Sequence, residues 1–215
     1  MAKKRKVDNL LALAVLSTIV ERPMHRYEIA QTMRERGKDH DMAIKWGSLY
    51  TVVQNMAKAG FLEVVGSERD GARPERVIYR ITDAGRAEMV DWTRELLTTP
   101  EPEHHRFVAG LSILAVLPPA DVIELLDARL DALGHAIDFA RRELGDLTGS
   151  LPRLFLVESE FGLAMLEAEA AWTRSLRAEL VEGTFAGLAQ WQEWHDRAIP
   201  PSEVAASIER GAAEN

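Results

Sequence analysis

The sequence predicts a mainly α-helical chain with one small two-stranded β-hairpin, arranged in two domains. Three observations predict this fold class. Helical periodicities fill the first 60 residues, two short strand-like runs follow at residues 61–65 and 76–81, and only helical patterns appear after residue 103. The composition is that of an ordinary globular protein, with 47% hydrophobic and 28% charged residues. The absence of cysteine excludes disulfides, thiolate metal sites and a cysteine nucleophile.

The amino-terminal elements follow from local patterns. Residues 8–20 are apolar nearly all round, which predicts a helix buried on more than one side. Residues 25–35 form a second helix, stopped by Gly37, and a third runs from Ser48 as N-cap to Gly60. The two strands enclose a turn-rich, charged connection over residues 66–75, and Thr82 caps a fourth helix that runs to about residue 97.

A seam at residues 98–103 separates the two domains, because it holds two prolines and two carboxylates but no apolar residue. Helices are expected to begin at Pro118, at Ser150 and after Gly183, and Pro200 ends the last one. We therefore expect one domain over residues 8–97 and an all-helical domain over residues 103–199. The ends, residues 1–7 and 200–215, are expected to be flexible.

Charge is divided unevenly between the two parts. The net charge is −8, with +3 on residues 1–97 and −11 on residues 98–215. Either the first part meets a polyanion or the acidic remainder is simply a solvated surface. The longest apolar stretch, residues 10–20, is too short to span a bilayer, so a soluble, cytoplasmic protein without a membrane partner is expected.

The predicted third helix has two distinct faces. One face is apolar at the spacing of a core helix: Leu49, Val52, Val53 and Met56. The other face, with Tyr50 beside it, carries short hydrogen-bonding groups and one cation: Thr51, Gln54, Asn55 and Lys58. Such groups can read base edges in a major groove, and Ser48 at the helix start can meet a phosphate. A polar surface helix without a partner is the alternative.

The charged connection of the hairpin favours the nucleic-acid interpretation. It presents Arg69, Arg73 and Arg76, which suit phosphate contact or a narrow minor groove. The carboxylates of Glu68, Asp70 and Glu75 are interleaved with them and can instead neutralise them. Three helices followed by a basic hairpin are typical of a winged helix-turn-helix domain that binds double-stranded DNA.

Three motifs, in order along residues 10–97, resemble PadR-type transcriptional regulators. They are the helix start Met24–Ile29, the run Gly47–Tyr50 followed by Met56, Lys58 and Gly60, and Arg73-Pro74 with Tyr79–Gly85. Arg26 stands where the family usually has Gly or Pro. The candidate DNA-binding residues are Arg26, Tyr27, Ser48, Tyr50, Thr51, Gln54, Asn55, Lys58, Arg69, Arg73 and Arg76.

The resemblance, together with the long helical second part, points to the larger subgroup of the family. It implies a homodimeric, nucleoid-associated repressor that binds a palindromic operator and is released by a small-molecule effector. The apolar stripes of the second part are wide for a two-helix core, and the all-round apolar first helix is expected to pack on a partner chain. A purely intrachain bundle is the alternative to this dimer. A winged-helix adaptor that binds a protein partner is the alternative function.

Weaker signals remain open. Trp92, Phe161 and Trp172 are candidates for an effector pocket, although their helical spacing is also typical of plain core. The basic residues Lys3–Lys6 form either a minor-groove arm or a solubilising end. Neither His104-His105 nor Asp39–Asp41 makes a convincing metal site, and no catalytic motif is present. We expect no metal, no cofactor other than a small-molecule effector, and no enzymatic activity.

Overall fold

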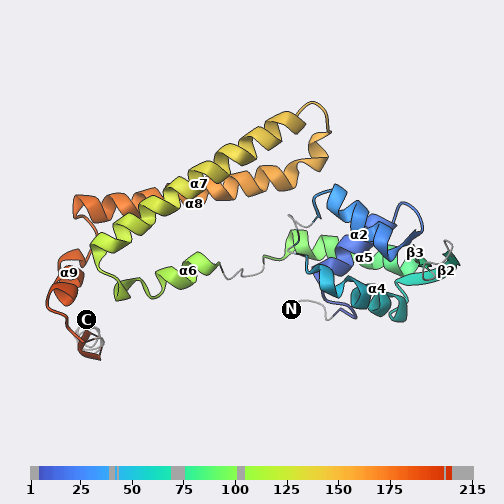
Figure 1. Ribbon diagram of the computed structural model, residues 1–215, viewed down its shortest axis with the longest axis horizontal. Helices are drawn as coiled ribbons and strands as arrows, with labels where there is room; N and C mark the ends of the chain where they lie inside the picture. Colours follow the sequence, from blue (N-terminus) through green and yellow to red (C-terminus); the bar gives the residue numbers. More distant parts are fainter. Residues whose placement is uncertain are drawn as a thin grey trace. The chain divides into compact units, whose positions relative to one another are not determined.

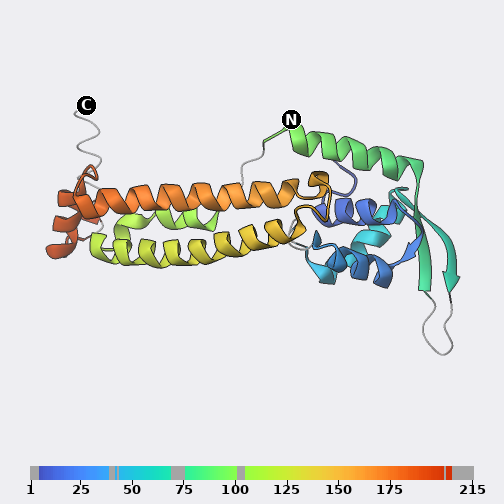
Figure 2. The same ribbon diagram turned by 90° about the horizontal axis from the view of Figure 1, so that it is seen from above.

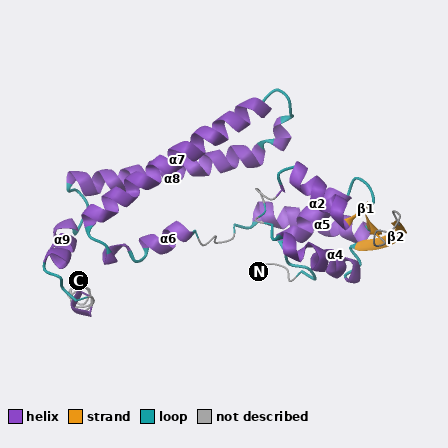
Figure 3. Ribbon diagram, viewed as in Figure 1, coloured by secondary structure: helices purple, strands orange, loops and turns teal. Residues whose placement is uncertain are grey.

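The computed structural model describes residues 5–38, 42, 44–68, 76–100, 105–200 and 202–204. The chain divides into two compact units, Met1–Pro102 and Glu103–Asn215. Figure 1 shows the helices and strands of both units with their labels. The expected fold class is confirmed: both units are built mainly from helices, and the described strands form one small sheet in the first unit (Figure 3).

The first unit contains helices and strands in the order of a winged helix. They are α1 (Leu10–Ile19), β1 (Met24–His25), α2 (Arg26–Glu35), the 3₁₀ turn η1 (Trp46–Ser48), α4 (Leu49–Lys58), β2 (Leu62–Glu68), β3 (Arg76–Ile81) and α5 (Asp83–Thr98). The antiparallel sheet has the order β1-β3-β2. Strand β2 ends at Glu68, three residues beyond the end that the sequence pattern predicted.

Helix α1 lies at the centre of this unit. Every residue from Leu11 to Leu16 is buried, and the helix packs on α2, α4, α5 and β3. Asn9 caps it by accepting a hydrogen bond from the Leu11 amide at 2.9 Å. Its own unit thus buries most of the apolar surface of α1, although Leu10 stays exposed, and contact of α1 with a partner chain stays a prediction.

Strand β1 was not predicted, because two residues leave no periodic pattern. Met24 pairs with Tyr79 and His25 with Ile78, so β1 joins the start of α2 to β3. The second helix accordingly begins at Arg26 rather than at His25. His25 instead caps it, since its Nδ1 accepts a hydrogen bond from the Glu28 amide at 3.1 Å.

The end of β3 and the start of α5 are joined by a close backbone packing. The Thr82 hydroxyl accepts from the Gly85 amide at 3.1 Å and donates to the Gly60 carbonyl at 2.7 Å. The Thr82 amide donates to the Phe61 carbonyl at 3.0 Å. A Cβ on Gly85 would overlap the Phe61 carbonyl oxygen and would lie 2.9 Å from Ile81 Cγ1. Only glycine fits at this crossing.

The second unit is helical throughout. It contains α6 (Arg106–Leu111), η2 (Leu114–Val116), α7 (Pro119–Leu147), η3 (Arg153–Phe155), α8 (Val157–Glu182) and α9 (Leu188–Asp196). Figure 2 shows α7 and α8 running side by side as a hairpin. The short α6 and η2 were not predicted, and α8 begins at Val157 rather than at Ser150, because η3 and a turn occupy the residues between.

The buried core between α7 and α8 is concentrated at the end of this helical hairpin where α9 packs. Val122, Leu126, Leu176, Leu180 and Trp191 form one buried cluster, and Leu133, Ile137 and Ala170 form a smaller one. The Trp191 Nε1 donates to the Leu117 carbonyl at 2.9 Å, which fixes α9 against the loop before α7. Among the described residues, no helix is both long enough and apolar enough to cross a bilayer.

Candidate nucleic-acid interface

Helix α4 separates a buried apolar face from an exposed polar face. Leu49, Val52, Val53 and Met56 are buried in the core of the first unit. The residues of the opposite face are exposed, apart from a half-buried Gln54: Thr51, Gln54, Asn55 and Lys58. The sequence has no Asp or Glu between Asp41 and Glu63, so the helix itself brings no negative charge to this face. Its end carries the positive charge of Lys58.

Ser48 does not act as predicted. It precedes α4 with helical dihedral angles and makes no capping hydrogen bond, because the turn η1 runs directly into the helix. Its hydroxyl donates instead to the Lys45 carbonyl at 2.8 Å. Ser48 thus occupies the N-cap position as predicted, but its side chain does not cap the helix, because its hydroxyl is bonded to Lys45.

Tyr50 is held on the same surface by two neighbours. The guanidinium carbon of Arg26 lies 3.9 Å from the centroid of the Tyr50 ring, and Gln54 Nε2 donates to the Tyr50 hydroxyl at 2.7 Å. The Tyr50 side chain nevertheless remains 53% exposed. Arg26 is the first residue of α2, so this contact joins the starts of the two helices of the helix-turn-helix.

A second cation–aromatic contact fixes the turn before α4. Arg34, near the end of α2, lies over the Trp46 ring at 4.1 Å, and Trp46 packs against the core. The sequence contained no signal for this pair, because twelve positions separate the two residues. Tyr27, by contrast, is exposed at the start of α2, 6.4 Å from the His25 ring.

Of the three arginines that were predicted to bind DNA from the β2–β3 hairpin, the structure describes one, Arg76. Arg76 begins β3 and pairs in register with Glu68 at the end of β2. Its side chain is partly exposed. Arg69 and Arg73 lie outside the described residues.

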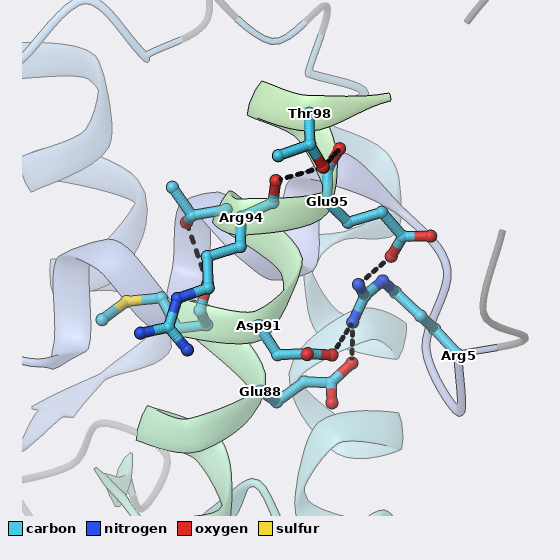
Figure 4. A network of polar contacts seen from close by, with 8 residues as sticks. Arg5, Glu88, Asp91, Arg94, Glu95 and Thr98 are labelled. Atoms are coloured by element: carbon cyan, nitrogen blue, oxygen red, sulfur yellow. Dashed lines mark hydrogen bonds and ion pairs between the residues drawn. The ribbon is translucent and has the colours of Figure 1, made fainter. Parts of the chain in front are cut away.

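Arg5 is fixed rather than part of a flexible end. Its side chain is 2% exposed and lies over the Trp92 ring at 4.9 Å. Figure 4 shows its guanidinium reaching three carboxylates of α5, those of Glu88, Asp91 and Glu95. Burial by itself would lower the pKa of Arg5, but the hydrogen bonds to Glu88 and Glu95 raise it above its ordinary value. Arg5 is therefore not available as a DNA-binding arm, and Lys3 and Lys4 lie outside the described residues.

The three candidate effector residues are divided between the two units, and their role in an effector pocket stays a prediction. Trp92 is buried in the core of the first unit, beside Arg5. Phe161 and Trp172 are exposed on α8, three turns apart. Sequence reasoning missed the neighbours of Trp172: Phe107 of α6 packs edge-on against it with centroids 5.9 Å apart, and Arg129 lies over Phe107 at 3.6 Å.

No group of three His, Asp or Glu residues in the described ranges has the arrangement of a metal site. Asp39, His40, Asp41 and His104 lie outside those ranges, and His105 is exposed just before α6.

Comparison with known proteins identifies the first unit. Residues 15–91 match the model of the transcriptional regulator PadR-like family. The fold is similar to that of Bacillus subtilis PadR crystallised with operator DNA, with a TM-score of 0.66 and 18% identity over 80% of this chain and 99% of that chain. The same protein crystallised with p-coumaric acid gives a TM-score of 0.64 at 19% identity over the same shares.

A PadR-like regulator of Bacillus cereus, BC1756, gives a TM-score of 0.55 at 15% identity, again over 80% of this chain and 99% of that chain. No curated protein matches the chain. These structural similarities extend over the long helical region, which fits the subgroup with a long carboxyl-terminal helical domain. Proteins of the matched family regulate transcription and are not enzymes. The first unit thus matches the transcriptional regulator PadR-like family over residues 15–91, and the fold, including the helical second unit, is similar to that of PadR regulators of known structure.

Proposed function

We propose that this protein is a sequence-specific regulator that binds double-stranded DNA through α4. The observation that carries the proposal is the exposed face of α4, where hydroxyl, amide and ammonium groups stand together without a carboxylate. The side-chain amide of Asn or Gln can form two hydrogen bonds with the major-groove edge of adenine, at N6 and N7. A lysine can bind guanine or a phosphate. A related fold, that of Bacillus subtilis PadR, was crystallised with operator DNA, which supports the same use of this fold here.

Binding to a palindromic operator as a homodimer is the second part of the proposal. The second unit exposes many large apolar side chains, more than a stable monomer leaves in water. They lie on α6, η2 and the α7–α8 hairpin: Val108, Ile113, Val116, Leu125, Phe139, Leu147, Leu151, Leu154, Phe155, Val157, Phe161, Met165, Trp172 and Val181. A second copy with the same apolar surface would cover them, and a two-fold pair would place two α4 helices about 34 Å apart, one turn of DNA.

The DNA-binding proposal is tested with the Asn55→Ala variant. A duplex is first selected from random-sequence DNA with the wild-type protein, and binding to it is compared with binding to a scrambled duplex of equal length by fluorescence anisotropy. Loss of a base contact should cost about 1–3 kcal/mol on the selected duplex and little on the scrambled one. Gln192→Ala, which removes an amide from α9, is the matched control and should leave both affinities unchanged.

Failure of the wild-type protein to prefer any selected duplex would refute the proposal. It would favour the alternative adaptor function, in which the winged helix contacts a protein.

The dimer is tested by sedimentation equilibrium. Wild-type protein should sediment as a dimer at micromolar concentration. The Phe139→Glu/Phe161→Glu double variant should sediment as a monomer, because each carboxylate would be buried without a partner in the interface. Monomeric wild-type protein would contradict the palindromic model.

Repression with release by a small molecule completes the proposal. The related Bacillus subtilis PadR was also crystallised with p-coumaric acid, which makes aromatic acids the first class of ligand to test. Titration of such acids should quench tryptophan fluorescence and lower affinity for the selected duplex. In a reporter strain, the protein should reduce expression from a promoter that carries this duplex, and increased expression would identify an activator instead.

A further inference from the structure

Arg26, the first residue of α2, lies beside the proposed DNA-binding face of α4. Among the described residues Arg26 pairs with no carboxylate; Glu28, two residues further along α2, is paired with Arg22. The guanidinium instead lies over the Tyr50 ring, 3.9 Å from the ring centroid. A planar guanidinium stacks on an aromatic face far better than a lysine ammonium does.

The second contact of Tyr50 sets the direction of its hydroxyl. Gln54 Nε2 donates to the Tyr50 oxygen at 2.7 Å, so the phenolic oxygen accepts on that side. Its own hydrogen is left to point elsewhere, and the ring is half-exposed. Tyr50 thus offers the solvent a hydrogen-bond donor, while Gln54 keeps its carbonyl oxygen as an acceptor and one further N–H.

We infer that Arg26, Tyr50 and Gln54 act as one unit that determines specificity, in which Tyr50 donates to an acceptor of the DNA and Arg26 is the positioning residue. This inference rests on the proposed function of α4. In a major groove, the acceptors within reach of such a donor are N7 and O6 of guanine, N7 of adenine and O4 of thymine.

The physical advantage of the unit is preorganisation. A free tyrosine at a helix surface samples several rotamers, and binding must restrict it to one. The stacked guanidinium and the hydrogen bond from Gln54 already restrict the ring before DNA arrives. Arg26 therefore contributes to affinity without touching the DNA, in contrast to an arginine that binds a phosphate.

A double-mutant cycle separates these two roles. Affinities for the selected and the scrambled duplex are measured for the wild type, Arg26→Ala, Tyr50→Ala and the Arg26→Ala/Tyr50→Ala protein, at several salt concentrations. Arg26→Ala should weaken binding to the selected duplex about two- to fivefold per half-site, the size of an exposed cation–π contact. The same change should have no effect in the Tyr50→Ala background.

The salt dependence supplies a second readout. An arginine that binds a phosphate changes the slope of log affinity against log salt by about 0.9. Under our inference, the slope for Arg26→Ala equals that of the wild type, and Arg26→Lys fails to restore affinity because an ammonium stacks poorly. Tyr50→Phe should lose the preference for the selected duplex while keeping the stacked ring.

Two results would overturn the inference. One is an equal effect of Arg26→Ala with and without Tyr50, accompanied by a lower salt slope and by rescue with lysine. The other is unchanged preference in Tyr50→Phe. Either result leaves the proposed function intact, provided that the wild type still prefers the selected duplex; loss of that preference in the wild type would refute the proposed function itself.

Discussion

Replacing Gly85 by alanine tests the tight backbone packing between the β2–β3 hairpin and the start of α5. The added methyl group would overlap the Phe61 carbonyl oxygen, which also accepts from the Thr82 amide at 3.0 Å. Overpacking costs about 1–3 kcal/mol, and disturbing the Thr82 cap adds about 1 kcal/mol. The higher helix propensity of alanine returns about 1 kcal/mol, so we expect a net loss of about 2 kcal/mol in the free energy of unfolding.

Urea-induced unfolding of the full chain measures this loss. With a slope of about 2 kcal/mol per molar urea, the transition of the first unit should move down by about 1 M. Hydrogen exchange of α5 peptides assigns the transition to that unit, since their amides should exchange faster in the variant.

Gly134→Ala is the matched control, because Gly134 lies inside α7 with open space where its Cβ would stand. This substitution should stabilise the second unit by up to about 1 kcal/mol. A Gly85→Ala protein with the midpoint of the wild type would show that the backbone crossing is not as tight as described.

Three further predictions concern charged residues. Arg5→Ala should lower the free energy of unfolding by about 1–3 kcal/mol, because three carboxylates of α5 lose their shared partner, and an unchanged melting temperature would count against the buried network. The hydrogen bond from Arg36 lowers the pKa of Glu21 below its ordinary value, so their pair stabilises the fold at neutral pH and stops doing so as the pH falls through that lowered pKa. Arg36→Gln should therefore differ from the wild type in thermal stability at pH 7 and converge with it in acid, and a constant difference would refute the linkage. Lys58→Ala should reduce the salt slope of DNA binding by about 0.9 per protomer, and an unchanged slope would remove Lys58 from the phosphate contacts.

The elements that sequence patterns predicted well are those whose signal is local. The buried face of α4 repeats at helical spacing, and Thr82 together with Gly85 marks the start of α5. Strand β1 and helix α6 escaped prediction because they are too short to show a period. The sequence predicted the N-cap position of Ser48 but not the absence of a side-chain cap, which follows from the turn η1 and the helical dihedral angles that it gives Ser48.

The site was predictable as a face of a helix but not as a set of contacts. The separation of Leu49, Val52 and Met56 from Thr51 and Asn55 is visible in the sequence alone. The pairing of Arg26 with Tyr50 is not, since 24 positions separate them and only the packing of α2 against α4 brings them together. Likewise, nothing in a basic amino terminus indicates that Arg5 is buried against Trp92.

The two-residue strand β1 has a mechanical consequence. His25 of β1 pairs with Ile78 of β3 and is followed directly by Arg26. The first turn of α2 is therefore tied to the β2–β3 hairpin through β1. Arg26, whose guanidinium lies over the Tyr50 ring, therefore directly follows a residue that is paired with β3. Under the proposed function, any displacement of the β2–β3 hairpin on DNA would reach the Arg26–Tyr50 contact through the two residue pairs that join β1 to β3.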